Sequence, residues 1–229
     1  MQQQSSKYFD FIKDNKDSHL ISNYLGWNSL LVVKFQLNKG SFLDNSEIDN
    51  KFNDLKGKQK IIVVVSGFLE IEIEDKKKTL KNFDAIDIIS SDQKFQILVK
   101  ENTSFFMISA KKLDKQSGNC NFFNFKKDIQ VKELWGGQCI SRPYEGRGLT
   151  LVLFDLKKGF KFDDKGHKNE QITWLISGKM DFYADGKHKT LTTDNGVDIG
   201  PDHLHGGVSA GALGFDAFFP KRQEIKYQN

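Results

Sequence analysis

The sequence predicts an all-β protein built from two copies of one β-barrel or jelly-roll domain. Two observations indicate this class: short apolar runs separated by turn residues, and a repeat of those runs at a fixed spacing. The runs are rich in Val, Ile and Phe, and Gly, Asn, Asp and Lys separate them, which is typical of β-sandwiches and barrels. A chain of 229 residues is long enough for two small domains, each with its own core.

Changes in composition divide the chain into four segments: an N-terminal extension (1–25), a first barrel (26–112), a linker (113–132) and a second barrel (133–223). The extension is polar, and Ser5 or Ser6 would cap a short helix over residues 8–12. Strands of the first barrel are expected in LLVVKFQL, IIVVVSGFLEIEIE, AIDII, FQILV and FFMISA. Strands of the second are expected in LTLVLFDL, QITWLISGKMDFYA, GVDI and FDAFFP.

The two barrels repeat each other in sequence. Ile61–Gly67 aligns with Ile172–Gly178 at a spacing of 111 residues. The same spacing pairs the following dipeptides: Thr79-Leu80 with Thr190-Leu191, Asp87-Ile88 with Asp198-Ile199, and Met107-Ile108 with Phe218-Phe219. Upstream the spacing is 119, between Leu37–Gly40 and Leu156–Gly159, so the first copy has a loop eight residues longer. A constant spacing over such a length indicates an internal duplication.

Histidines cluster in the second copy, where four of the five lie: His167, His188, His203 and His205. If the chain is extended after His167, its period of two places His167 and Gln171 on one face and Glu170 on the other. Two imidazoles and one amide or carboxylate oxygen suit a divalent metal ion, of Fe, Mn, Co, Ni or Zn. The predicted ligands are His167, Gln171 and His205, and Glu170 replaces Gln171 if the strand parity shifts.

The frame around these residues resembles the two motifs of the cupin superfamily. Those motifs are a Gly followed by His-x-His-x(3,4)-Glu/Gln and a later Gly, and then Gly, Pro and His. The segments HKNEQITWLISG and FFPKR are also similar to the C-terminal half of the bicupin isomerase of the bacilysin pathway. The resemblance matches His167 to the second histidine of the first motif, Gln171 to its Glu/Gln ligand, and His205 to the histidine of the second motif. Lys165 stands where the first histidine is expected.

Two further residues are candidates for catalysis. Lys165 either points to water or, if held within a cavity, acts as a general base. His203 either acts as a general acid or base near the metal or is a solvated turn residue. Arg142 and Arg147, with Tyr144 between them, either clamp a carboxylate or phosphate or lie at the surface. His188, in a Lys-His-Lys segment, is expected at the surface.

The first copy lacks the candidate ligands. At a spacing of 111, His167, Gln171 and His205 correspond to three lysines: Lys56, Lys60 and Lys94. A protonated ammonium offers no lone pair, so we expect a first barrel without metal, with a structural role or with an affinity for an anion. Gln96 is an alternative counterpart of His205 if the loop alignment slips.

The composition gives little support to nucleic-acid binding. The 34 basic and 30 acidic residues give a net charge of +4, and the lysines are dispersed. Cys120 and Cys139 lack the spacing of a metal site and are expected to be ordinary thiols. No run approaches the roughly 20 apolar residues that span a bilayer, and the N-terminus has no apolar core of a signal peptide. We therefore expect a soluble cytoplasmic protein.

Together these observations predict a bicupin with a degenerate first barrel and a candidate metal site in the second. The resemblance implies a metal-dependent enzyme, an isomerase or tautomerase, acting on a small oxygenated metabolite such as a keto acid or sugar derivative. Dioxygenase chemistry needs the same kind of open metal site and stays open. The alternative is a non-catalytic bicupin that binds a small molecule. A third hypothesis is a structural role in which barrel edges pair across a homodimer.

Overall fold

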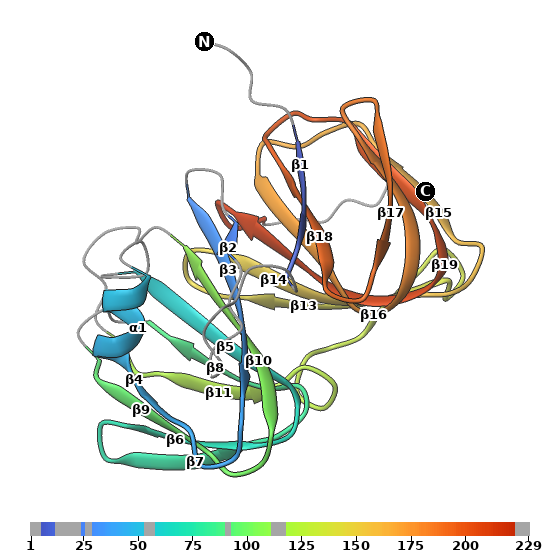
Figure 1. The fold of residues 1–229 in the computed structure, drawn as a ribbon. Coiled ribbons are helices and arrows are strands. Elements are labelled where there is room, and N and C mark those ends of the chain that lie inside the picture. Colours follow the sequence, from blue (N-terminus) through green and yellow to red (C-terminus); the bar gives the residue numbers. More distant parts are fainter. Residues whose placement is uncertain are drawn as a thin grey trace. The chain divides into compact units, whose positions relative to one another are not determined.

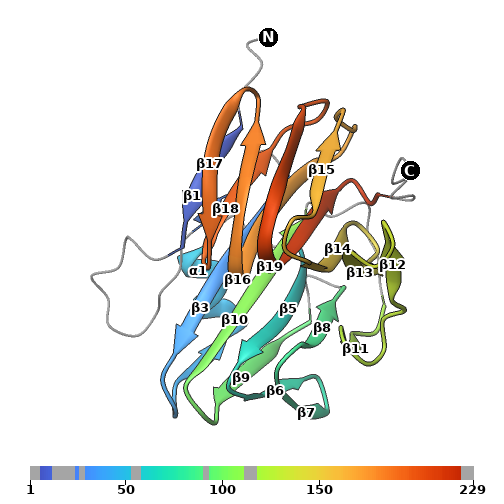
Figure 2. The ribbon, with the colours of Figure 1, turned by 90° about the vertical axis from the view of Figure 1, so that its right-hand side faces the viewer.

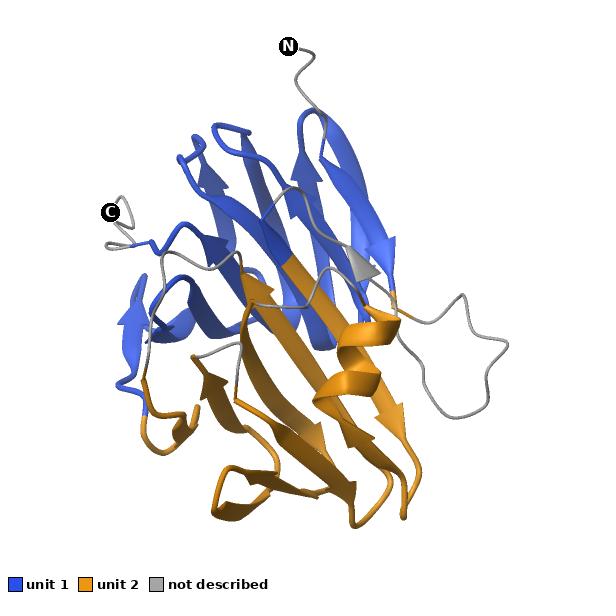
Figure 3. Ribbon diagram, turned by 90° about the vertical axis from the view of Figure 1, so that its left-hand side faces the viewer, with its two compact units in different colours: residues 1–10, 25–30, 129–229 blue, residues 11–24, 31–128 orange. Residues whose placement is uncertain are grey.

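The computed structural model describes residues 6–11, 24–25, 29–52, 58–89, 93–110 and 118–222. The chain divides into two compact units (Figure 3): unit 1 comprises residues 1–10, 25–30 and 129–229, and unit 2 comprises residues 11–24 and 31–128. Most of the described residues lie in strands, and one α-helix is present among them, which confirms the predicted all-β class. Within these residues, no helix has the length and apolar content needed to cross a membrane.

Unit 2 is a pair of antiparallel sheets around an apolar core. Its described elements are β2 (Tyr24–Leu25, at the boundary with unit 1), β3 (Leu30–Leu37), β4 (Phe42–Asp44), α1 (Asn45–Lys51), β5 (Gln59–Ser66), β6 (Leu69–Ile73), β7 (Lys76–Leu80), β8 (Asp84–Ile88), β9 (Phe95–Val99), β10 (Thr103–Ala110) and β11 (Asn121–Asn124). One sheet has the order β11-β8-β5-β10-β3-β2, and the other has the order β4-β9-β6-β7. Phe35, which stacks on Phe105 with ring centroids 4.7 Å apart, is among the side chains that fill the core.

The described strands of unit 1 form one nine-stranded sheet, through which two long strands run. Its described strands are β1 (Lys7–Asp10), β12 (Lys132–Leu134), β13 (Cys139–Glu145), β14 (Thr150–Leu156), β15 (Lys161–Asp164), β16 (Glu170–Ala184), β17 (Lys187–Thr192), β18 (Asn195–Ile199) and β19 (His205–Phe219). The sheet order is β1-β18-β16-β19-β14-β13-β12, and β15 pairs with β19 and β17 with β16. Figure 2 shows β16 and β19 side by side, paired from Glu170 with Phe219 to Ala184 with His205.

The strand registers bear out the duplication and correct part of the alignment. Lys60 lies opposite Ile88, as Gln171 lies opposite Ile199, so the spacing of 111 holds for these strands. The last strand differs. Met107 lies opposite Ile62, and the residue opposite Thr173, the counterpart of Ile62, is Asp216. The aligned pair Met107 and Phe218 was therefore wrong by two residues, because the chain leading into the last strand is shorter in unit 1.

Gly178 lies where β16 bends, next to irregularities in the pairing of β16 with β19. Its φ is +85°, and a Cβ atom added to it would lie 2.0 Å from the carbonyl oxygen of Gly211. Gly67, at the corner between β5 and β6, has φ +71° and would meet the oxygen of Asn102 at 2.2 Å. Only glycine combines this φ with so close an approach, which explains the Ser-Gly pair in both copies.

The N-terminal segment is a strand where the sequence predicted the start of a helix. Within the expected helix over residues 8–12, Tyr8 to Asp10 belong to β1, and residue 12 lies outside the described residues. β1 pairs antiparallel with β18, from Lys7 opposite Asp198 to Asp10 opposite Asn195. Phe9 is buried there. Long-range pairing therefore overrides a weak local helix preference.

Two features appear in stretches that were predicted as connections. The expected linker over residues 113–132 contains β11, which pairs with β8. The longer loop of the first copy contains α1. Asp44 caps this helix, since its Oδ1 accepts from the amide of Glu47 at 2.8 Å, and Glu47 Oε2 accepts from the amide of Asp44 at 3.2 Å. Ile48 anchors the helix in the core.

A buried carboxyl group that has no hydrogen-bond partner among the described residues distinguishes unit 1 from unit 2. Asp198 is fully buried, and neither of its oxygens has a hydrogen-bond partner among the described residues. Burial, followed by the charge of Glu170, raises the pKa of Asp198 to about 8. Glu170 itself accepts from the amides of Ser29 and Leu30 at 3.2 and 3.1 Å. At the equivalent positions in unit 2, Gln59 Nε2 donates to Asp87 Oδ1 at 2.8 Å.

We predict that Asp198→Asn stabilises the protein at pH 8. Because the folded-state pKa is raised, the folded protein keeps a proton that the unfolded chain releases, so stability falls as pH rises from about 4 to about 8. Asparagine cannot ionise, so the variant gains on the order of a few kcal/mol at pH 8 and much less at pH 4. Urea unfolding, monitored by tryptophan fluorescence, measures the free energy of unfolding of each protein at pH 8 and at pH 4.

Asp87→Asn is the matched control, because Asp87 already has an amide partner. It should not stabilise unit 2 at either pH. An Asp198→Asn variant that is less stable than wild type at pH 8 would contradict the assignment of a buried carboxyl group with a raised pKa.

Candidate metal centre and its pocket

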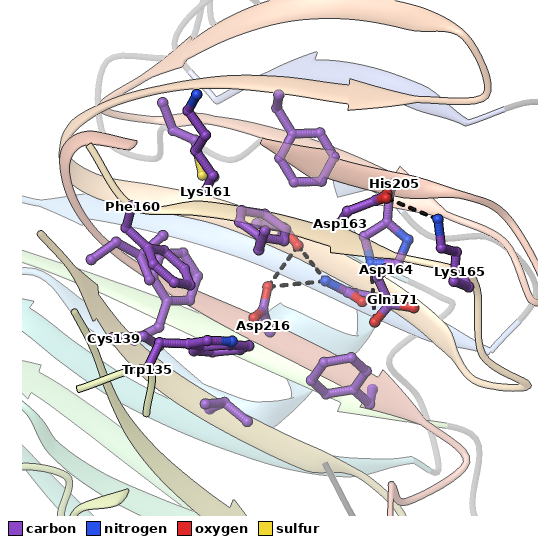
Figure 4. Close-up of a pocket in the computed structure, with 18 of the residues that line it drawn as sticks. Trp135, Cys139, Phe160, Lys161, Asp163, Asp164, Lys165, Gln171, His205 and Asp216 are labelled. Carbon is purple, nitrogen blue, oxygen red and sulfur yellow. Dashed lines mark hydrogen bonds and ion pairs between the residues drawn. The ribbon is translucent and has the colours of Figure 1, made fainter. Parts of the chain in front are cut away.

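Unit 1 contains a cavity of about 320 Å³, lined by residues of β13, β14, β15, β16 and β19 and of neighbouring loops. Figure 4 shows Trp135, Cys139 and Phe160 at one end of this cavity and Asp164 and His205 at the other. Both polar residues lie at the end of the cavity where β15 pairs with β19, and the register places Asp164 directly opposite His205. The cavity is therefore apolar at one end and polar at the other.

Three side chains converge at the polar end. Asp164 at the end of β15, His167 in the following loop and His205 at the start of β19 each offer one ligand atom, and these atoms lie within 4.8 Å of one another. The Asp164 backbone and side chain are fixed locally, since Oδ1 accepts from the amide of Gly166 at 2.9 Å. Oδ2 lies 3.5 Å from Arg222 Nη2 and 4.0 Å from His205 Nε2.

His205 presents a lone pair to this cluster. Its Nδ1 lies 3.0 Å from the carbonyl oxygen of His203, which can only accept, so Nδ1 carries the proton. Nε2 then faces Asp164 Oδ2 at 4.0 Å. Burial lowers the pKa of His205, so the ring is neutral at neutral pH and two acceptors face each other. A cation between them would satisfy both.

His167 has a matching arrangement. Its Nε2 lies 2.8 Å from the amide oxygen of Gln171, and that oxygen only accepts, so Nε2 carries the proton. Nδ1 is buried and has no hydrogen-bond partner among the described residues. Burial, and then the charge of Arg222, lower the pKa of His167 to about 4. Two neutral imidazoles and a carboxylate are a donor set that fits a divalent metal ion.

A second network lies beside the first. Gln171 Nε2 donates to Thr173 Oγ1 at 2.8 Å and to Asp216 Oδ1 at 3.2 Å, and Thr173 Oγ1 donates to the same oxygen at 2.6 Å. Burial raises the pKa of Asp216 to about 6, although these hydrogen bonds oppose the shift. Asp216 therefore exchanges a proton close to neutral pH inside the cavity.

The structure places the predicted residues in different surroundings. Gln171 lines the cavity and holds His167, whereas the alternative ligand Glu170 points away and binds the amides of Ser29 and Leu30. Lys165 lies at the rim, with its side chain 73% exposed and its Nζ 3.0 Å from Asp163. Of the two alternatives expected for Lys165, a lysine that points to water and a general base held within a cavity, the structure shows the first.

His203 is buried and paired, and it is not the solvated residue considered from the sequence. Its Nδ1 lies 2.7 Å from Asp185 Oδ2, which also accepts from the amide and hydroxyl of Ser6 at 2.8 and 2.6 Å. His203 is absent from the described lining of the cavity. Its contribution to the centre is the main-chain oxygen that orients His205.

Three cavity residues were missed from the sequence: Asp164, Asp216 and Arg222. Asp164 precedes His167 by three residues, so proximity to a predicted ligand could have indicated it. Arg222 ends the FFPKR segment singled out from the sequence, but nothing local places it or Asp216 in the cavity, because strand pairing brings both there from far along the chain. The arginines considered from the sequence, Arg142 and Arg147, are not among the described lining residues.

In unit 2 the equivalent positions carry other chemistry. Lys60, the counterpart of Gln171, is buried and pairs with Asp49 of α1 at 3.2 Å. Burial lowers the pKa of Lys60, and Asp49 opposes this. The register places Phe95 opposite Ile73, as His205 lies opposite Ala184, so Phe95 and not Lys94 is the counterpart of His205. The predicted counterpart of His167, Lys56, lies outside the described residues.

The duplicated jelly roll with this cavity is the cupin fold, as comparison with solved structures shows. A cupin 2 conserved barrel domain protein from Leptotrichia buccalis matches with a TM-score of 0.64 and 17% identity, over 96% of this chain and 99% of that chain. Ylba from E. coli matches with a TM-score of 0.73 and 11% identity, over 96% and 93% of the two chains.

Oxalate decarboxylase from Bacillus subtilis, a protein with Mn(II) centres, is similar as well. Its TM-score is 0.69 at 10% identity, over 97% of this chain and 79% of that chain. No protein-family model and no curated protein matches the sequence. At these identities the likeness establishes the fold.

We predict that Asp185→Asn weakens metal binding at a distance from the ligands. The change removes the charge that holds His203, whose carbonyl orients His205. Residues that orient a metal ligand typically contribute about 10–100-fold in affinity. Competition titration with a chromophoric chelator measures the affinity.

Asp181→Asn is the matched control, since Asp181 is exposed and bonds only to Thr190 among the contacts resolved for it. It should bind metal as wild type does. Equal affinities of the Asp185 and Asp181 variants would show that the Asp185–His203 contact does not support the centre.

Proposed function

We propose that the protein is a metal-dependent enzyme that moves a proton on a small oxygenated metabolite, a keto acid or sugar derivative, as an isomerase or tautomerase. The observation that carries this proposal is the convergence of Asp164, His167 and His205, of which Asp164 and His205 line the polar end of the cavity. The likeness of two segments to the bicupin isomerase supports the reaction class. The Mn(II) centres of oxalate decarboxylase illustrate that a cupin fold accommodates a metal.

Asp164, His167 and His205 would hold the metal, and Gln171 would orient His167 and complete the polar wall. When bound by these residues, a divalent ion would supply a Lewis acid for a substrate carbonyl and for the negative charge that develops on its oxygen. The apolar end of the cavity excludes water around the substrate.

Asp216 is the proposed proton carrier. Thr173 and Gln171 both donate to Oδ1, so Oδ2 is left to take a proton from the carbon beside the carbonyl and to return it to another carbon. Lys165 and His203, the candidates from the sequence, are less well placed, because one lies at the rim and the other is bonded to Asp185.

The second candidate function is binding without turnover. It is favoured by Arg222, whose Nη2 lies 3.5 Å from Asp164 Oδ2 and competes with a metal for that carboxylate. A metal-free cavity with this ion pair would capture a small molecule by its polar groups alone. Metal content separates the two functions.

Elemental analysis of tag-free protein should find close to one divalent ion per chain. The double variant His167→Ala/His205→Ala should lose it, and Asp164→Asn should weaken it, because these residues supply the ligand atoms. His188→Ala is the control, since His188 is exposed in a hairpin and contacts Tyr183. If wild-type protein purified with metal supplementation contains no metal, the metalloenzyme proposal is contradicted.

Proton transfer should be visible as exchange of substrate hydrogens with deuterium in D2O, followed by proton NMR on a panel of 2-oxo acids and uronic acids. Because Asp216 must be ionised to accept a proton, the rate should rise with pH through about 6 and then level off. Asp216→Asn should keep the metal and lose at least about 100-fold in rate. A metal-loaded protein that exchanges no member of the panel would favour the binding function.

A further inference from the structure

Arg222 reaches the cavity from the segment after β19, and its backbone is clamped there. Its amide donates to Thr150 Oγ1 at 3.0 Å, and the same hydroxyl lies 3.4 Å from the Arg222 carbonyl oxygen. Thr150 is buried at the start of β14. The Arg222 side chain is 14% exposed, and its guanidinium carbon lies 5.0 Å from the centroid of the Phe218 ring. The guanidinium group is thus fixed at the polar end of the cavity.

The guanidinium group is only partly used by the protein. A guanidinium has five N–H donors in a planar fork. The contacts resolved for Arg222 give it one acidic partner, Asp164, at 3.5 Å through a single nitrogen, which is longer than a strong charge-assisted hydrogen bond. Donors remain to bind an anion, and a carboxylate is the planar group that matches their geometry.

The opposite end of the cavity suits an apolar body. A series of ring contacts runs along the wall: Trp135 to Phe160 at 5.0 Å, Phe160 to Phe162 at 6.1 Å, Phe162 to Phe182 at 6.0 Å, and Phe182 to His205 at 6.2 Å. Aromatic walls bind planar or apolar groups and offer few partners to the hydroxyl groups of a sugar. Figure 4 shows Trp135 and Phe160 on the side opposite to His205.

The other charged groups of the cavity make Arg222 decisive for an anion. Asp164 and Asp216 line the same space and repel a carboxylate. Of the two other cations in the lining, Lys161 lies beside Phe160 on the side away from His205 in Figure 4, and Lys165 is engaged by Asp163 at the rim. A carboxylate ligand therefore depends on Arg222 to enter the polar end.

We propose that the cavity binds a small carboxylic acid with an apolar or aromatic body, and that Arg222 is the residue that selects its carboxylate. This inference rests on the proposed function, since it names the substrate class of the same site. Of the two substrate classes in the proposed function, keto acids and sugar derivatives, the inference favours acids whose remaining part is apolar or aromatic.

The test compares 3-phenylpropanoate with its neutral analogue 3-phenylpropanamide by isothermal titration calorimetry, on metal-supplemented and metal-stripped wild-type protein. The acid should bind at least about 10-fold more tightly than the amide, a preference typical of a charge-assisted contact. Gluconate, an acid with a hydroxylated body, should bind more weakly than 3-phenylpropanoate. Equal affinity for the acid and the amide would overturn the proposal.

Arg222→Gln should lose the preference for the acid and keep the affinity for the amide, and Arg222→Lys should retain part of the preference. Arg142→Gln is the matched control, because Arg142, a residue of β13, is not among the described lining residues. An Arg222→Gln variant that still prefers the acid would also overturn the proposal. Thermal unfolding of each variant reports whether it is folded.

Metal analysis of the same samples separates this inference from the proposed function. An acid preference that depends on Arg222, in protein that takes up no metal even when supplemented, supports the inference and contradicts the proposed metalloenzyme. Bound metal without a preference for the acid supports the proposed metal-dependent enzyme and contradicts the proposal that Arg222 selects a carboxylate.

Discussion

The pairing of β16 with β19 is the interaction on which the rest of unit 1 depends. It joins the two histidine-bearing segments, and its register decides which side chains share the cavity. Because neighbouring residues of a strand face opposite sides, Gln171 enters the cavity network while Glu170 turns to the amides of Ser29 and Leu30. A slip of one residue would exchange these roles and place an unneeded carboxylate beside Asp216.

The duplication preserved the backbone and changed the chemistry of its buried positions. Where unit 1 has Gln171 and His205, unit 2 has Lys60 and Phe95. The ammonium group of Lys60 requires a counter-ion in the interior, and the extra residues of the first copy provide it as Asp49 on α1. The insertion and the substitution therefore belong together: the helix supplies the charge that a buried lysine needs.

The sequence predicted the fold well because its evidence is periodic and repeated. Alternating apolar runs and the spacing of 111 residues identify the strands, and the paired Ser-Gly corners mark equivalent bends. His167, Gln171 and His205 were brought to one place, as their motif context indicated. Asp216 and Arg222 lay beyond prediction, because a residue near the chain's end reaches the cavity only through the register of β19 and the Thr150 clamp. The strand β1 was missed for the same reason, since its partner β18 is distant in sequence.

The route of the N-terminal segment sets an order for biosynthesis. Ser6 and β1 are synthesised before Asp185, His203 and β18, to which they bind. Unit 2, by contrast, finds most of its strand partners within residues 31–128. Its strands can pair while the remainder is still being translated. Unit 1 becomes complete only when β1 pairs with β18. A fragment that begins at residue 129 lacks β1 and would expose the free edge of β18.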